Sequence, residues 1–163
     1  MNTLKERILT IIEKNSRINL KELAIMLGTE EIEVANALQE METDGIICGY
    51  HTMINWDKTE REYVSALIEI KVLPVKGEGF DSVAEYICSF PEVVSVSLMS
   101  GGFDLAVTLE GKTMKDVARF VFDKLAVIDG VTSTATHFVL NKYKDKNVVI
   151  GRAGEDDDRV LVL

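Results

Sequence analysis

Apolar residues recur at helical spacing in three short segments of residues 1–45. The apolar stripe of the first segment consists of Leu4, Ile8, Ile11 and Ile12. Its helix is expected to end near Asn15, and a second helix is expected to run from the N-cap residue Asn19 to Gly28. The third is expected to take Thr29 as its cap and to end at Gly45. Because only Gly28 and Thr29 separate the last two helices, the pattern predicts a helix-turn-helix.

The third predicted helix, residues 30–43, is the one that would read DNA in such a unit. Its buried stripe is expected to be Val34, Leu38 and Met41. Its exposed positions are expected to include Glu31, Glu33, Asn36, Ala37 and Glu40. The same three-helix shape also serves as a docking or dimerisation module, because a fold does not fix its function. The pattern therefore leaves both uses open.

From residue 64 every second residue is apolar and small or β-branched, and this period of two predicts a strand over residues 64–72. Helical spacing from Phe80 to Ile87, and again after the cap residue Thr113, predicts two helices. The remaining strands are expected at residues 93–99, 103–110 and 131–140, and a turn at residues 100–102 joins the first two as an antiparallel hairpin. The order strand, helix, strand, strand, helix, strand predicts an α+β, ferredoxin-like βαββαβ sandwich.

Such a fold places both helices on one face of the sheet and leaves the other face open. Strands as apolar as residues 67–72 and 93–98 are expected to expose a large apolar patch on that face. Sheet-to-sheet dimerisation is the simplest way to bury the patch.

The pattern divides the chain into four parts. Residues 1–46 form the helix-turn-helix domain, residues 47–62 a linker strand and hinge, and residues 63–147 an effector-sensing and oligomerisation domain. The linker is rich in β-branched and aromatic residues over 46–54, so it is expected to be an extended connector or a strand. Residues 148–163 form an acidic and then apolar tail, which is either a disordered extension or a strand that docks on a neighbour.

Composition narrows the class of protein. Of the 163 residues, 47% are apolar and 28% charged, the balance of a folded protein. The start of the chain has no apolar signal core, so a cytoplasmic location is expected. Neither a disulfide nor a zinc site is expected from Cys48 and Cys88, which lack a nearby ligand pair. No nucleophile–base pair, metal spacing or phosphate loop is evident, so no enzyme activity and no cofactor are expected.

The charge is unusual for a protein that binds DNA. The net charge is −9, and residues 1–58 hold six basic and ten acidic residues, a local net charge of −4. No lysine or arginine lies between Lys21 and Lys58. Phosphate contacts would come from backbone amides at helix starts and from Lys5, Arg7, Lys14, Arg17, Lys21 and Lys58. DNA binding is therefore expected to be weak, to depend on oligomer avidity, or to be directed to few sites.

Two segments carry a family resemblance. Asp44–Tyr50, Asp-Gly-Ile-Ile-Cys-Gly-Tyr, follows the third helix, and Ser100–Asp104, Ser-Gly-Gly-Phe-Asp, forms the hairpin turn. In this order and spacing they resemble the Lrp/AsnC family of prokaryotic amino-acid-responsive regulators, over residues 4–146. The resemblance implies a winged helix-turn-helix, a swapped linker strand and a RAM or ACT-like sensor domain. It also implies dimers that assemble further into tetramers, octamers or hexadecamers.

In that family a small ligand, often an amino acid, binds between dimers near the hairpin turn and the last strand. The effector residues that the resemblance implies are Gly101, Gly102, Asp104, Met114, Thr134, Thr136, His137 and Phe138. Glycine amides can approach a carboxylate closely and an aspartate can bind an ammonium, so an amino-acid zwitterion would suit the turn. Alternatively, the glycines and Asp104 serve only the hairpin, and the threonines reflect strand propensity.

The positions expected to contact DNA follow from the helix pattern and the charges together with the same resemblance. They are Lys21, Thr29, Glu30, Glu31, Glu33, Asn36, Ala37, Gln39 and Glu40. Typical members carry arginines on the recognition helix, and this chain has none there. Bases would be read by Asn36 or Gln39, whose amides can pair with adenine.

Two other functions are compatible with this architecture. One is an amino-acid-sensing oligomer that has lost DNA binding and acts on a protein partner, which the acidic third helix favours. The other is an enzyme, because siroheme decarboxylases resemble the same two-domain arrangement. A polycarboxylate substrate would need a basic cluster around a pocket. The chain has only two separated histidines, His51 and His137, which disfavours the enzyme.

Overall fold

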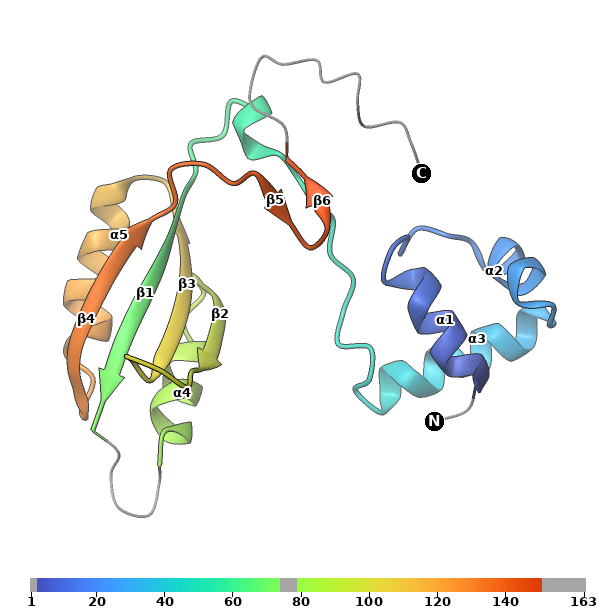
Figure 1. The fold of residues 1–163 in the computed structure, drawn as a ribbon, viewed down its shortest axis with the longest axis horizontal. Coiled ribbons are helices and arrows are strands. Elements are labelled where there is room, and N and C mark those ends of the chain that lie inside the picture. Colours follow the sequence, from blue (N-terminus) through green and yellow to red (C-terminus); the bar gives the residue numbers. More distant parts are fainter. Residues whose placement is uncertain (1–2, 74–78, 151–163) are drawn as a thin grey trace. The chain divides into compact units, whose positions relative to one another are not determined.

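The computed structural model describes residues 3–73 and 79–150, which form two compact units (Figure 1). The units divide between Ile54 and Asn55, inside the stretch expected to be a linker. Each unit has its own cluster of buried apolar residues. Most of the acidic and apolar tail, from residue 151, lies outside the described residues. In the described part of the chain no helix is long and apolar enough to span a membrane.

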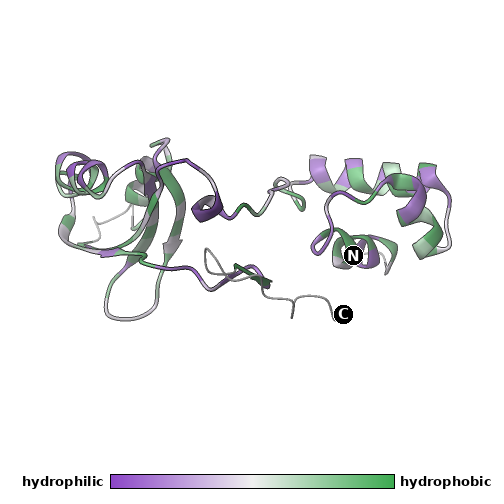
Figure 2. Ribbon diagram, turned by 90° about the horizontal axis from the view of Figure 1, so that it is seen from above, coloured by the Kyte–Doolittle hydropathy of each residue, from purple (hydrophilic) through white to green (hydrophobic). Residues whose placement is uncertain are grey.

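The first unit consists of the helices α1 (Thr3–Ile12), α2 (Leu20–Leu27) and α3 (Glu31–Thr43). Their buried side chains are those of Ile8, Leu23, Ala24, Leu27, Val34, Ala37 and Met41. Hydrophobic and hydrophilic positions alternate in bands along these helices in Figure 2, as expected for helices that share one core. Asn19 Oδ1 accepts the backbone N–H of Glu22 at 2.8 Å, which confirms the predicted cap of α2.

The turn between α2 and α3 depends on Gly28. Its φ of 69° lies in the left-handed region, which glycine adopts without steric cost. The next residue, Thr29, donates its backbone N–H to the carbonyl of Ala24 at 3.1 Å and so closes α2. Two consecutive helices with a glycine turn between them give the predicted helix-turn-helix.

Three details of this unit differ from the predictions. Helix α1 ends at Ile12, before Asn15, although the backbone N–H of Asn15 still donates to the carbonyl of Ile11 at 3.0 Å. The N-cap of α3 is Glu30 and makes no side-chain cap hydrogen bond; Thr29 instead donates its hydroxyl to the carboxylate of Glu33. The prediction that Ala37 is exposed was also wrong. Ala37 is only 7% exposed, because it follows Val34 by three residues and shares its face toward the core.

The second unit contains a four-stranded antiparallel sheet in the order β2-β3-β1-β4. The strands are β1 (Val64–Val72), β2 (Val93–Leu98), β3 (Leu105–Gly111) and β4 (Val131–Phe138). The helices are α4 (Asp81–Cys88) and α5 (Met114–Phe120), and α5 continues into a π-helical turn, Val121–Leu125. Thr113 and Asp116 form the reciprocal capping box at the start of α5. The predicted α+β, βαββαβ order is confirmed.

One face of the sheet packs against α4 and α5. Alternate residues of β1, from Ala66 to Val72, point to this face and are buried. Leu105, Val107 and Leu109 of the neighbouring strand β3 join the same core. The apolar residues of the central strands are therefore already covered within one chain.

The open face does not carry the large apolar patch that was expected. It consists mainly of small and polar residues: Ser95, Ser97, Glu69, Ala106, Thr108, Ser133, Ala135 and His137. Leu67 is its large apolar residue on β1, with 37% of its surface exposed. The expectation failed because side chains alternate along β1, and Ile68 and Ile70 point toward the helices. The hydrophobicity summed along the strand therefore overstates the apolar surface that the open face exposes.

Residues 48–55 contain no strand, so within one chain this segment is an extended connector rather than a paired strand. A 3-10 turn, Trp56–Lys58, follows it. Beyond β4 a short hairpin pairs β5 (Lys144–Asp145) with β6 (Val148–Val149). Its turn places Lys146 and Asn147 at positive φ, the geometry that matches the twist of a two-residue hairpin. The sequence patterns had not indicated this hairpin.

Candidate DNA-binding and effector-binding surfaces

The surface of α3 presents two amides and several carboxylates. Asn36 and Gln39 are exposed, three positions apart on the helix. The remaining exposed positions among those predicted to contact DNA are Lys21, Glu30, Glu31, Glu33 and Glu40. Thr29 is half-buried, and the methyl group of Ala37 faces the core, so Ala37 does not present its side chain at this surface.

Two of the carboxylates on α3 have partners within the unit. Glu40 Oε2 lies 2.9 Å from Nζ of Lys5, which joins α3 to α1. The hydrogen bond to Glu40 raises the pKa of Lys5. Glu33 accepts the hydroxyl of Thr29. The acidic character of α3 is therefore partly offset at its far end by Lys5, while Glu30 and Glu31 at its start are exposed.

Positive charge in the first unit gathers around the start of α2. Lys14 and Arg17 lie in the turn that precedes this helix, and Lys21 lies in its first turn. All three are exposed. The backbone N–H of Arg17 donates to Asn15 Oδ1 at 3.2 Å, which orders the turn. Three cations beside the positive end of a helix dipole form a surface that can hold phosphate.

Asp104 ties the hairpin turn to the end of β1. Its Oδ2 accepts the backbone N–H of Val72 at 2.8 Å, and its own N–H donates to the carbonyl of Ile70 at 3.0 Å. Its carbonyl accepts the N–H of Met99 at 2.8 Å and closes the β2–β3 hairpin. The carboxylate predicted to hold an effector thus also has a structural role.

The glycines of the same turn are not required by the fold. Gly101 and Gly102 are exposed, and neither has a positive φ. A Cβ added at either position would meet no atom within 4 Å. Glycine here therefore leaves the turn open to close approach from outside the chain rather than relieving strain within it.

The other predicted effector residues are not gathered at this turn. Thr134, Thr136 and Phe138 lie on the helix-facing side of β4, whereas His137 is on the open face with its Nε2 3.3 Å from Glu69 Oε1. Met114 begins α5, which follows the end of β3 distant from the turn. One chain alone does not bring the eight residues into a single pocket.

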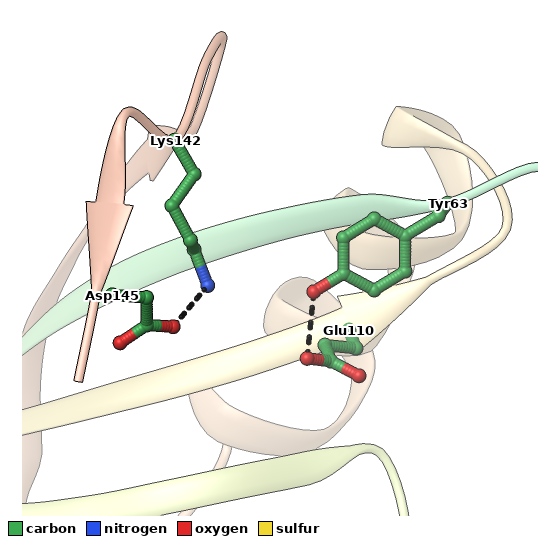
Figure 3. A network of polar contacts seen from close by, with 4 residues as sticks. All are labelled: Tyr63, Glu110, Lys142 and Asp145. Carbon is green, nitrogen blue, oxygen red and sulfur yellow. Dashed lines mark hydrogen bonds and ion pairs between the residues drawn. The ribbon is translucent and has the colours of Figure 1, made fainter. Parts of the chain in front are cut away.

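A hollow of about 440 Å³ lies elsewhere in the second unit, at the end of the sheet away from the hairpin turn. Its lining residues are Arg61, Glu62, Tyr63, Pro91, Glu92, Val94, Glu110, Gly111 and Lys112. Figure 3 shows the ring of Tyr63 with its hydroxyl directed at Glu110, to whose Oε1 it donates at 2.7 Å. Burial and then this hydrogen bond raise the pKa of Tyr63 to about 12. Sequence reasoning missed this cluster, since its residues come from three distant segments.

Comparison with known proteins identifies the family. The Lrp/AsnC ligand binding domain matches residues 65–149, and a winged helix-turn-helix DNA-binding domain matches residues 1–47. The chain is 47% identical over 156 residues to the HTH-type transcriptional regulator YugG of Bacillus subtilis, covering 95% of this chain and 93% of the relative. The chain belongs to the Lrp/AsnC family. This Lrp/AsnC protein is therefore an HTH-type transcriptional regulator with a ligand-binding domain, and the decarboxylase alternative is set aside because its relatives are regulators.

Solved structures share the fold of this Lrp/AsnC protein. The Neisseria meningitidis regulator NMB0573, in complex with L-Met, has a TM-score of 0.71 at 22% identity, with 89% of this chain and 93% of that chain covered. AsnC of E. coli has a TM-score of 0.66 at 21% identity, with 87% and 93% covered. At these identities the likeness establishes the two-domain fold alone.

Proposed function

We propose that this regulator reads DNA with Asn36 and Gln39 of α3 and that an amino acid controls its DNA affinity or its assembly. The exposed pair of amides on α3, directly behind the Gly28 turn, carries the first half of the proposal. Side-chain amides bind adenine in the major groove with two hydrogen bonds. The regulator would act in the cytoplasm, where its DNA lies.

The charges of the first unit support a binding mode with few phosphate contacts. Lys14, Arg17 and Lys21 would hold phosphate at the start of α2, and the exposed Glu30 and Glu31 would repel it near α3. One unit would bind weakly under these conditions. Two or more units on one DNA molecule would raise the affinity through their effective concentration.

The open face of the sheet is the surface that we propose for dimerisation. Small side chains such as Ser97, Ala106 and Ala135 would let a second sheet approach closely, and Leu67 would be buried between them. Higher assembly would follow from further contacts between dimers. A second copy would also bring together effector residues that one chain leaves apart.

The effector that we propose is an amino acid bound at the turn of Gly101, Gly102 and Asp104. The open space at the two glycines suits the carboxylate of the ligand, and Asp104 suits its ammonium. The L-Met complex of the Neisseria regulator supports this class of ligand. Met114 of α5 and Thr134, Thr136, His137 and Phe138 of β4 would contribute from a neighbouring copy.

The decisive experiment is DNA selection with the full chain. Genomic fragments, including the promoter of its own gene, are incubated at low ionic strength, and retained fragments are measured by fluorescence anisotropy. We expect Asn36→Ala to cost about 1–3 kcal/mol on specific sites, and Lys21→Gln to weaken all sites and reduce the salt slope by about 1. Lys115→Gln on α5 is the matched control and should change neither the DNA affinity nor its salt dependence. Failure to retain any fragment at low salt would refute DNA binding.

A regulator that acts on a protein partner is the second candidate. It is favoured by exposed apolar side chains beside the turn: Ile25, Met26 and Ile32 are exposed by 71%, 59% and 61%. Together with the acidic α3 they form a surface suited to protein contact. If no DNA is retained, this candidate predicts that Ile32→Ser abolishes regulation in cells while the fold and the amino-acid response persist.

A further inference from the structure

The hollow at the far end of the sheet is built by three segments that pairing brings together. Val64 at the start of β1 lies opposite Gly111 at the end of β3. The backbone N–H of Glu110 donates to the carbonyl of Glu92 at 3.1 Å, which fixes the segment before β2 against β3. Residues 61–63, 91–94 and 110–112 therefore surround one space, and none of the eight predicted effector residues lines it.

The charged groups around this space are of both signs and form no ion pair with one another in the described residues. Arg61 and Lys112 supply positive charge, while Glu62, Glu92 and Glu110 supply negative charge. Within residues 3–73 and 79–150, the contacts closer than 4 Å between basic and acidic side chains are Lys5–Glu40, His137–Glu69 and Lys142–Asp145, so none joins members of this cluster. Opposite charges that face a common space without pairing are free to bind a ligand that carries both.

Two of these groups are held in place. The guanidinium of Arg61 lies over the ring of Trp56, with Cζ 4.2 Å from the ring centre. Glu110 is held by the hydroxyl of Tyr63 at 2.7 Å, which occupies only one of its two oxygens. A cation and an anion fixed on one hollow present a charged pair that is already oriented, so less freedom is lost when a ligand binds.

We propose that this hollow binds an α-amino acid with an apolar side chain, at a site separate from the Gly101–Asp104 turn. The carboxylate of the ligand binds Arg61 and Lys112, and its ammonium binds Glu110 and Glu92. Its side chain packs on Pro91 and Val94, the apolar part of the lining. The site shares no residue with the effector site proposed above, so it stands whether or not that site, or DNA binding, is correct.

The test uses Trp56, the single tryptophan of the chain, as the reporter. Leucine, isoleucine, valine, methionine and phenylalanine are each titrated into the full-length protein, and binding is followed by Trp56 fluorescence and by calorimetry. We expect at least one of the five to change the fluorescence with saturation. Isoamylamine is leucine without its carboxylate, and 4-methylpentanoate is leucine without its ammonium. Each should bind more weakly than leucine.

Matched variants decide where the ligand binds. Lys112→Gln and Glu110→Gln should each weaken binding about tenfold, the effect of one charge-assisted contact. Glu110→Gln keeps an acceptor for Tyr63, so the fold is retained. Lys115→Gln and Glu85→Gln, exposed charges outside the hollow, should leave binding unchanged. The proposal is overturned if none of the five amino acids binds, or if Asp104→Asn abolishes the signal while Lys112→Gln and Glu110→Gln do not.

Discussion

At the scale of single residues, Asp104 combines structure with the proposed recognition of an effector. Its carboxylate caps the last N–H of β1 at Val72, and its backbone completes the neighbouring hairpin. Neither Gly101 nor Gly102 beside it has a positive φ, and a Cβ at either position would have room, so the backbone does not require glycine there. Conventional turn chemistry therefore explains Asp104 but does not explain the two glycines.

Two substitutions of Asp104 separate its roles. Asp104→Asn keeps an acceptor for the N–H of Val72 and removes the charge, so we expect unchanged stability without ligand and a lost thermal shift with the effector. Asp104→Ala leaves that N–H unpaired and should also lower the free energy of unfolding by about 1–3 kcal/mol. Thermal unfolding of both variants, without ligand and with each common amino acid, measures the stability and the shift that the effector causes. An effector shift that persists in Asp104→Asn would remove Asp104 from the site.

At the scale of elements, the starts of α2 and α3 differ in how they are capped. Asn19 satisfies the N–H of Glu22 at the start of α2, whereas Glu30 at the start of α3 makes no side-chain cap hydrogen bond. Thr29, which by sequence resembles a cap, is used to close α2. Local residue preference therefore identified both helices but placed the cap of α3 one residue too early.

Paired alanine substitutions test this difference in capping. Asn19→Ala removes a cap hydrogen bond and should lower the free energy of unfolding by about 1 kcal/mol. Thr29→Ala removes only the side-chain contact of Thr29 with the exposed Glu33 and should cost less than about half as much. Urea unfolding followed by circular dichroism measures both. Equal losses would mean that Thr29 caps α3 after all.

At the scale of the whole molecule, the open face of the sheet determines how copies can assemble. Its rows of small residues, with Leu67 among them, are suited to close approach of a second sheet rather than to a deep apolar interface. The contact between His137 Nε2 and Glu69 Oε1, at 3.3 Å, places two polar side chains on the same face. A dimer built here would be moderately polar for an interface between identical subunits.

Leu67→Asp tests this interface by placing a charge at the centre of the open face. We expect the molar mass in light scattering after size exclusion to fall toward that of one chain, because a buried unpaired charge opposes association. Leu98→Asp is the control, since Leu98 is also exposed but pairs with Leu105 on the helix-facing side. If the molar mass is unchanged in Leu67→Asp but falls in Leu98→Asp, the dimer interface lies elsewhere.

The sequence by itself determined the three helices of the first unit and the βαββαβ order of the second, because helical and alternating periodicities are local properties of Leu4–Met41 and Val64–Phe138. It also identified the family through the turns at Gly45 and Gly101. Only the tertiary structure decided which faces remain exposed, turning Ala37 and Ile68 inward. It alone gathered Arg61, Glu92 and Lys112 around one hollow, because strand pairing joins residues whose separation in sequence carries no signal.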